Sequence, residues 1–312
     1  NVQRIIMTIP SLITSLARTD LIMFGMLMLS MSASVLIPGT RHSPEPTVYA
    51  SPVPTVDTLP THQVDTLNVS NIASAILPKI EVESRAYPST LPDFSAIKDV
   101  STKKQMFFNY MLPKVRQAND KILADRRLLM MIRDDLTTGD TLDPDDIQFI
   151  GALKTRYRAG QQTNLRSIVD DLLIRVDVVP ESLVLAQAAN ESGWGTSRFA
   201  RQANNLFGIW CFSEGCGLTP KNRDEGLTHE VTKYETVQEG LVAYIHTINT
   251  NPAYTYLRDI RATTRSQEQH FSGLALAEGL LRYSSRGIEY VRDIQQLIRV
   301  NELQKYTLPL QA

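Results

Sequence analysis

The segment from Leu185 to Trp210 reads LAQAANESGWGTSRFARQANNLFGIW, and it changes character abruptly at Glu191. The residues before Glu191, from Pro180 onward, are mostly apolar and small, which predicts a buried helix that other helices can approach closely. Glu191 stands where this helix should end, and Ser-Gly-Trp-Gly follows at positions 192–195. A single carboxylate therefore lies beside glycines and a tryptophan at the end of an apolar helix.

These surroundings suit a carboxyl group that keeps its proton near neutral pH. The negative end of a helix dipole raises the pKa of a carboxyl group, and exclusion of water by Trp194 should raise it further. A general acid that protonates a glycosidic oxygen needs such a group. Gly193 and Gly195 allow a sharp turn and the close approach of a flat sugar ring. A purely structural alternative stays open at this point, because glutamates at helix ends and tryptophans in cores are common.

Two spaced blocks in this segment carry a resemblance to a known family. Glu-Ser-Gly-Trp-Gly at 191–195 is followed by Asn-Leu-Phe-Gly-Ile at 205–209. The pattern closely resembles the signature of the bacterial N-acetylglucosaminidases of glycoside hydrolase family 73, which are mannosyl-glycoprotein endo-beta-N-acetylglucosaminidase-like peptidoglycan hydrolases. Two later stretches, 228–258 and 281–298, resemble the Bax-like branch of this family. The resemblance covers roughly Leu91 to Leu303.

The resemblance implies a mainly α (α+β) fold, a lysozyme-like helical bundle with a small β-hairpin lobe and the active cleft between them. Helical spacing of apolar residues over 106–132 agrees with such a bundle, although Pro113 should kink or divide that helix. Asp143-Pro144 and the region of Asn164 should begin further helices. Alternation over 227–232 predicts a strand or hairpin between positions 216 and 234.

The resemblance also implies roles for particular residues. Glu191 matches the catalytic general acid. A second glutamate on the β-lobe often activates water in this family, and the candidates are Glu225 and Glu230; we favour Glu225 because it lies nearer the expected hairpin tip. Both are equally consistent with solvated turn or strand charges. Tyr283 matches the tyrosine of a Tyr-Ala-Thr-Asp motif and would orient the N-acetyl group or the water, but Arg286 replaces the aspartate.

Substrate contacts are expected around the same segment. Aromatic faces suited to stacking on sugars are supplied by Trp194, Phe207 and Trp210, and the expected substrate-binding set is Trp194, Asn205, Phe207, Trp210 and Glu230. Tyr290 is expected only to pack on the last helix. The arginines 258, 261 and 265 recur at helical spacing and are expected to form a solvated face, or to contact peptide stems or phosphate in the wall.

The rest of the chain suggests export. Residues 21–38 carry no charge and are preceded by Arg4 and Arg18, so we expect a signal peptide or membrane anchor over 1–40. A Pro/Ser/Thr-rich tether follows over 41–92. One lysozyme-like domain is then expected over 93–308, with a helical lead-in at 93–175 and a catalytic core at 176–303.

The two cysteines of the chain, Cys211 and Cys216, are five positions apart. In an exported protein such a close pair predicts a small disulfide-closed loop, whereas in the cytosol it would be two reduced thiols. A metal site is disfavoured, because His229, His246 and His270 share no metal-ligand spacing. No nucleotide-binding motif occurs, and no cofactor is expected.

A formal net charge of -1 argues against a nucleic-acid partner. The expected function is an exported hydrolase that cuts β-1,4 bonds after N-acetylglucosamine, with peptidoglycan glycan strands as partner. The chain is expected to be a monomer in the periplasm or cell envelope, held at the inner membrane if the first segment is uncleaved. Two alternatives stay open: a lytic transglycosylase or muramidase on the same fold, and a catalytically impaired wall-binding protein.

Overall fold

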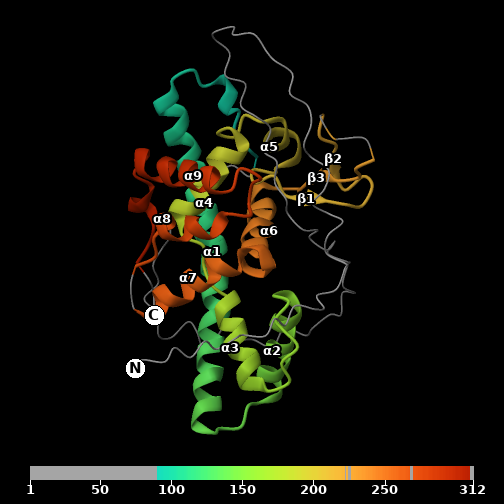
Figure 1. The fold of residues 1–312 in the computed structure, drawn as a ribbon, viewed down its shortest axis with the longest axis vertical. Coiled ribbons are helices and arrows are strands. Elements are labelled where there is room, and N and C mark those ends of the chain that lie inside the picture. Colours follow the sequence, from blue (N-terminus) through green and yellow to red (C-terminus); the bar gives the residue numbers. More distant parts are fainter. Residues whose placement is uncertain (1–89, 222, 224–225, 268–269, 310–312) are drawn as a thin grey trace, which may run out of the picture. The chain divides into compact units, whose positions relative to one another are not determined.

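The computed structural model describes residues 90–309, except 222, 224–225 and 268–269 (Figure 1). The expected signal or anchor at 1–40, the tether up to residue 89, and Glu225 therefore lie outside the described residues. Within the part that is described, no helix is both long and apolar enough to cross a membrane.

The described chain is mainly helical, with one small antiparallel sheet, as the lysozyme-like resemblance implied (Figure 1). The first half holds η3 (Phe94–Ala96), α1 (Val100–Thr138), α2 (Pro144–Arg156), α3 (Leu165–Arg175), α4 (Glu181–Ser192) and α5 (Arg198–Ala203). The strands β1 (Trp210–Cys211), β2 (Gly217–Leu218) and β3 (Glu230–Thr232) follow. The chain then forms α6 (Val237–Thr250), η4 (Pro252–Tyr254), α7 (Thr255–Ser266), α8 (Gly273–Leu276), η5 (Ala277–Leu280), α9 (Ile288–Val300) and η6 (Leu303–Tyr306).

Local capping chemistry explains where several helices begin. The Asp143 carboxylate accepts a hydrogen bond from the amide of Asp146, and Pro144 occupies the first helical position of α2. The Asn164 side chain caps α3 in the same way. Pro180 is the residue immediately before α4. The starts predicted for these three helices are confirmed.

Helix α1 is longer than expected and is not divided at Pro113. Its first half supplies Phe107, Met111 and Val115 to the main hydrophobic core, which lies around α4. Its second half packs Leu129 and other residues into a separate core with α2 and α3. Buried side chains on both sides of the proline hold the helix together, so tertiary packing offsets the hydrogen bond that proline cannot donate.

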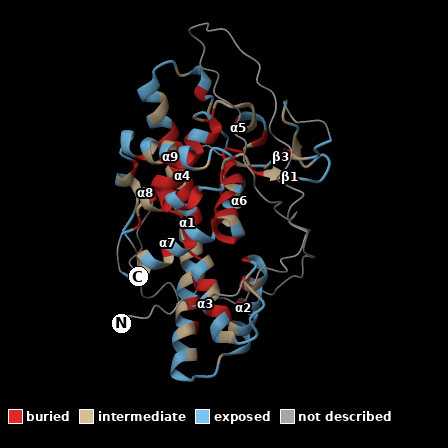
Figure 2. Cartoon of the chain, in the orientation of Figure 1, coloured by how far each residue is buried: buried red, intermediate tan, exposed pale blue. Residues whose placement is uncertain are grey.

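Helix α4 lies in the middle of the main core. Every residue of α4 except Asn190 is buried, and the helix packs against α1, α8, α9 and η6 (Figure 2). A helix that is buried all round must satisfy its polar side chains internally. This requirement applies to the buried polar residues of the helix, Glu181, Ser182, Gln187, Glu191 and Ser192.

The sheet has the strand order β1-β3-β2, with both pairs antiparallel. The expected hairpin between residues 216 and 234 corresponds to β2 and β3, but β3 is only three residues long. Strand β1 was not predicted, because its two residues show no alternation. Trp210 pairs with Val231 and Cys211 pairs with Glu230, so the second signature block runs directly into the sheet.

The three arginines of α7 do not form a solvated face, and that expectation is wrong. Arg261 is fully buried, Arg258 is nearly so, and Arg265 binds the Asp177 carboxylate through two nitrogens. Arg261 also donates to the backbone carbonyl of Asp177 and to the Asn249 side chain. These bonds join α7 to α6 and to the link between α3 and α4. Helical spacing alone does not distinguish a charged outer face from charges buried with partners.

Candidate active site

Glu191 lies in the last turn of α4 and is only 6% exposed. The helix ends at Gly193 in the left-handed region, and Trp194 and Gly195 also have positive φ angles of 61° and 75°. Three consecutive residues of this kind reverse the chain sharply. A Cβ atom at Gly195 would lie 2.6 Å from the ring of Phe94, so glycine is needed there for space as well as for backbone conformation.

The Glu191 carboxyl group is held by side chains rather than left open to water. Its Oε1 atom accepts hydrogen bonds from the Tyr290 hydroxyl at 2.7 Å and from the Asn190 amide at 3.1 Å. The Tyr290 oxygen in turn accepts a bond from Gln187 Nε2 at 2.9 Å. The Tyr244 hydroxyl donates to Gln187 Oε1. A chain of four side chains thus runs from α6 through α4 and α9 back to the carboxyl group.

Burial raises the pKa of Glu191 to about 7. The donors Tyr290 and Asn190, and the positive charge of Arg286, act in the opposite direction because they favour the ionised form. Trp194, which we expected to shield this carboxyl group, packs its ring against Phe107 and Phe108 of α1. A carboxyl group with a pKa near neutrality is able to donate a proton at physiological pH.

The hydroxyl groups of Tyr283 and Tyr290 have different partners from those that we expected. Tyr283 is buried, and its hydroxyl donates to the Phe207 carbonyl at 2.8 Å. Its ring stacks on Tyr290, with centroids 5.3 Å apart. Tyr290, expected only to pack, bonds directly to Glu191. In this structure Tyr283 therefore reaches the site through the Tyr290 ring.

Sequence reasoning missed Gln187 and the bonding role of Tyr290, although signals for both were present. Gln187 is the polar residue one helical turn before Glu191 in an otherwise apolar run, so the two side chains share a face. Tyr290 lies on the buried side of α9, where a tyrosine hydroxyl requires a partner.

The second signature block holds the loop and the sheet together. The Asn205 amide donates to the carbonyls of Ile209 and Thr232, each at 2.9 Å, and its oxygen accepts from the amides of Phe207 and Ile209. Phe207 is buried and stacks on Tyr244, with centroids 4.0 Å apart. The predicted substrate-binding residues Asn205 and Phe207 are therefore engaged within the protein itself, and Phe207 presents no ring face to a ligand.

Trp210 differs from these two residues because it is half-buried on β1. Its ring stacks on that of His229, with centroids 4.1 Å apart.

The surface has a depression of about 440 Å³ beside α5, immediately after the glycine turn. This depression is lined by Thr196, Arg198, Arg201 and Gln202.

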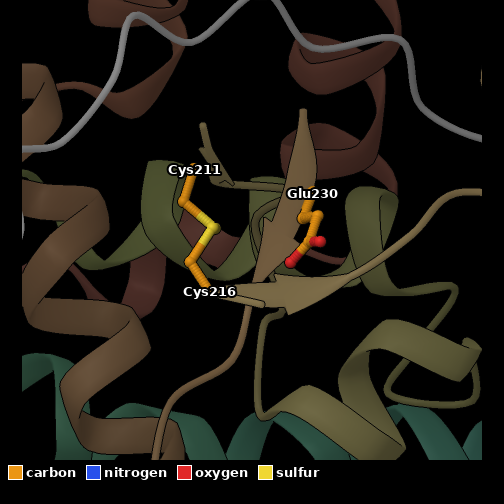
Figure 3. A group of neighbouring side chains, drawn as sticks. All are labelled: Cys211, Cys216 and Glu230. Atoms are coloured by element: carbon orange, nitrogen blue, oxygen red, sulfur yellow. A yellow bond between two sulfur atoms is a disulfide. The ribbon is translucent and has the colours of Figure 1, made fainter. Parts of the chain in front are cut away.

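The predicted disulfide between Cys211 and Cys216 is present, with the two Cα atoms 6.2 Å apart (Figure 3). Glu230 lies beside it on β3. Its carboxylate accepts hydrogen bonds from the amides of Gly215 at 3.2 Å and Gly217 at 2.7 Å. Glu230 thus fastens the chain on both sides of Cys216. The disulfide and the two hydrogen bonds of Glu230 therefore hold the same loop in place between β1 and β2.

Known proteins of one family match the part of the chain that contains Glu191 and the two signature blocks. Residues 167–303 match the family model Glucosaminidase, described as mannosyl-glycoprotein endo-beta-N-acetylglucosaminidase. The protein named Protein bax of Escherichia coli (strain K12) is 32% identical over 206 residues, which is 66% of this chain and 72% of that protein. No solved structure is significantly similar to the chain. The chain therefore belongs to the glucosaminidase family, as a Bax-like member.

Proposed function

We propose that this protein is an exported peptidoglycan hydrolase that cleaves the β-1,4 bond after N-acetylglucosamine, with Glu191 as general acid. Membership of the glucosaminidase family supports a glycosidase-type peptidoglycan hydrolase. The observation that carries the finer assignment is the buried Glu191 carboxyl group, whose pKa lies at about 7 at the end of α4. Its position directly before the glycine turn supports the approach of a sugar to that carboxyl group.

The proposed chemistry begins with transfer of the Glu191 proton to the glycosidic oxygen as the bond from that oxygen to C1 breaks. Water must then add to C1. In an inverting reaction a second carboxylate takes one proton from that water, and Glu191 regains its own proton from solvent. In a retaining reaction the 2-acetamido oxygen attacks C1 first, and the Glu191 carboxylate then takes the proton from the water that opens the ring intermediate.

In the inverting route Glu225 would take the proton from the attacking water. In the retaining route the acetamido group of the substrate would attack C1. Glu230 is a weaker candidate, because its carboxylate already binds two backbone amides. Proton NMR of the first-formed sugar distinguishes the two routes. An initial α anomer together with loss of activity in Glu225→Gln supports an inverting pair. An initial β anomer with activity retained in Glu225→Gln supports the acetamido route.

The proposal is tested by zymography on peptidoglycan gels with the wild type and Glu191→Gln. The expected result is a cleared band for the wild type and none for the variant, while both bind purified cell walls. Glu181→Gln is the matched control, since Glu181 is a buried glutamate at the opposite end of the same helix and should leave the cleared band intact. If neither the wild type nor Glu191→Gln clears the wall, the enzyme hypothesis fails and the wall-binding alternative stands. If both clear it equally, Glu191 is not the general acid.

Mass spectrometry of the digested wall tests the bond that is cut. Products that end in reducing N-acetylglucosamine support the proposal, whereas 1,6-anhydromuramic ends would replace it with a lytic transglycosylase.

Export is supported by the Cys211–Cys216 disulfide, because such bonds persist in oxidising compartments. Fractionation of cells expressing the protein tests this part: recovery with the periplasm or envelope is expected, and recovery with cytosolic marker enzymes would contradict it.

A further inference from the structure

The hydrogen-bond chain that ends at Glu191 has a single direction. Tyr244 donates to Gln187, Gln187 donates to Tyr290, and Tyr290 donates to Glu191. All four side chains are buried. They come from three helices, because Gln187 and Glu191 lie on α4, Tyr244 lies on α6 and Tyr290 lies on α9. Every proton in the chain therefore points toward the carboxyl group.

The orientation of the Gln187 amide follows from the number of protons available. Tyr290 has one hydroxyl proton, which it gives to Glu191, so the group on its other side must be a donor. Only the amide nitrogen of Gln187 satisfies that requirement. The amide oxygen then faces Tyr244, whose hydroxyl donates to it. A reversed amide would place its oxygen against the Tyr290 oxygen and compete for the same proton.

We propose that Gln187 is a positioning residue, which holds the Tyr290 hydroxyl as a donor to Glu191 and so fixes both the place of the carboxyl group and the ease with which it loses its proton. A hydroxyl whose oxygen accepts a hydrogen bond becomes a stronger donor, because bonds in a chain polarise one another. A stronger donor to a carboxylate stabilises the ionised form. The Gln187 side chain thus influences the Glu191 carboxyl group through Tyr290 rather than through a hydrogen bond of its own.

Other polar groups face Glu191, but none of those described takes the place of the hydrogen-bond chain that ends at Tyr290. Tyr283 and Arg286 approach from the turn before α9, Tyr254 approaches from η4, and Asn190 is the neighbouring residue on α4. Arg286 acts only through its charge, since its guanidinium group binds Asp293. Of the described side chains, Tyr290 and Asn190 are the ones that donate a hydrogen bond to the Glu191 carboxyl group.

The test measures the protonation of Glu191 directly, by carbon-13 NMR titration of glutamate-labelled full chain. The Glu191 signal is identified by its loss in Glu191→Gln. Tyr290→Phe should raise the pKa of Glu191 by about one pH unit, because a donor to the charged form is lost. Gln187→Leu should raise it by less, and Tyr244→Phe by least. A shift that decreases along the chain is expected from polarisation and not from a general loosening of the core.

Tyr110→Phe is the matched control. Tyr110 is a buried tyrosine on α1 whose hydroxyl has no hydrogen-bond partner among the described residues, so its removal should leave the Glu191 titration unchanged. If Gln187→Leu fails to fold, Gln187→Met keeps the length of the side chain and removes its donor without adding a titrating group. Gln187→Met should raise the pKa of Glu191 as Gln187→Leu does. A Glu191 titration that is equal in the folded Gln187 variant and in Tyr110→Phe overturns the proposal.

The kinetic consequence rests on the proposed function and is measured separately. The alkaline limb of the kcat/KM profile on peptidoglycan should move to higher pH in Gln187→Leu, with kcat reduced several-fold and KM unchanged. If the NMR shifts appear while the wild type hydrolyses no peptidoglycan, the positioning role stands and the proposed function fails. If hydrolysis depends on Glu191 but the NMR shifts are missing, the proposed function stands and the positioning role fails.

Discussion

Glu191 is a carboxyl group on which two influences compete. Burial disfavours its charge, whereas the donors Tyr290 and Asn190 favour it, and burial is the larger effect because the pKa remains at about 7. The raised pKa has a cost in stability as well as a use in chemistry. A carboxyl group that holds its proton more tightly in the folded protein makes folding less favourable as pH rises.

The sign of this effect yields a prediction for Glu191→Gln. Between the usual value of 4.5 and the folded value of about 7, the folded state binds more protons than the unfolded state, so the wild type loses stability as pH rises through this range. The loss should reach about 3 kcal/mol by pH 8. Glutamine carries no charge, so Glu191→Gln should escape the loss. Urea unfolding at pH 4.5 and pH 8 measures the difference; an equal pH dependence in both proteins would contradict it.

The pH dependence of activity should also report the protonation of Glu191. Since a general acid works only when protonated, hydrolysis of peptidoglycan should decline above about pH 7 as Glu191 ionises. The pH profile of kcat/KM measures this limb in the free enzyme. A profile that stays flat to pH 9 would exclude Glu191 as the proton donor. Glu181→Gln should leave the limb where it is in the wild type.

At the scale of elements, the junction between α3, α4, α6 and α7 depends on one carboxylate. Although burial alone would raise the pKa of Asp177, the hydrogen bonds and charges of Arg265, Arg261 and Arg126 lower it. Arg126 comes from α1, so this helix also reaches the junction, and five helices meet at or beside this group. The cluster carries more positive than negative charge, and its arginines rely on Asp177 and on backbone carbonyls for compensation.

Asp177→Asn should therefore be strongly destabilising. Removal of the negative charge leaves buried arginines without their counter-ion, and losses of this kind are about 3–5 kcal/mol. Glu289→Gln is the control, because Glu289 and Arg292 form an exposed pair whose loss should change stability by less than about 1 kcal/mol. Denaturant unfolding at pH 7 measures both. Similar small losses in the two variants would show that Asp177 does not hold the junction.

The sheet gives a second prediction at this scale. The loop closed by Cys211 and Cys216 is short, so the disulfide should contribute about 2 kcal/mol by restricting the unfolded chain. The double variant Cys211→Ser, Cys216→Ser should melt at a lower temperature and hydrolyse peptidoglycan more slowly, because β1 carries Trp210. Treatment of the wild type with a dithiol reductant should reproduce the effect and leave the double variant unchanged. An unaltered melting temperature in the double variant would contradict the prediction.

Features that depend only on neighbouring residues could be predicted from the sequence. Helix starts at Asp143, Asn164 and Pro180 were predictable because capping and proline chemistry lie within a few residues. The burial of Arg261 was not predictable, since its partner Asp177 is 84 positions away and its partner Asn249 lies on a different helix. The apolar run before Glu191 predicted its place at the end of a helix, which α4 confirms, and the family signature implied its role as general acid.

The remainder of the site depends on helices brought together by packing. The link from Gln187 through Tyr290 to Glu191 joins residues about a hundred positions apart. Asn205 and Phe207 show the converse limit: the signature contains them, yet their side chains bond and pack within the protein. A motif thus identifies residues that a family needs, and only the structure separates those that meet a ligand from those that hold the loop.

At the scale of the whole described chain, the two ends of the fold meet in one core. Leu303 of η6 is fully buried in the same cluster as Phe94 and the first half of α1. Gln304 accepts hydrogen bonds from the Ser182 hydroxyl on α4 and from the amide of Gly273. The last turn of the described fold therefore packs against the helix that carries Glu191.

Leu303→Ala should destabilise the protein by about 2–5 kcal/mol, because it leaves a cavity in the main core. Leu308→Ala is the control, since Leu308 is 43% exposed and its truncation should change stability by no more than about 0.5 kcal/mol. Thermal melting followed by circular dichroism measures both variants. A melting temperature for Leu303→Ala that equals that of Leu308→Ala would show that the C-terminal turn is dispensable.

The placement of α1 has a consequence for how the protein is made. At about 1.5 Å per residue, this 39-residue helix is about 58 Å long, and its apolar face serves both cores. Synthesis proceeds from the N-terminus, so α2 and α3 can cover its second half soon after it leaves the ribosome. The face around Phe107 and Met111 must wait for α4 and α6, which pack on the first half of α1 and end at Thr250. A nascent chain therefore exposes that apolar surface to chaperones and to aggregation while residues 112–250 are being made.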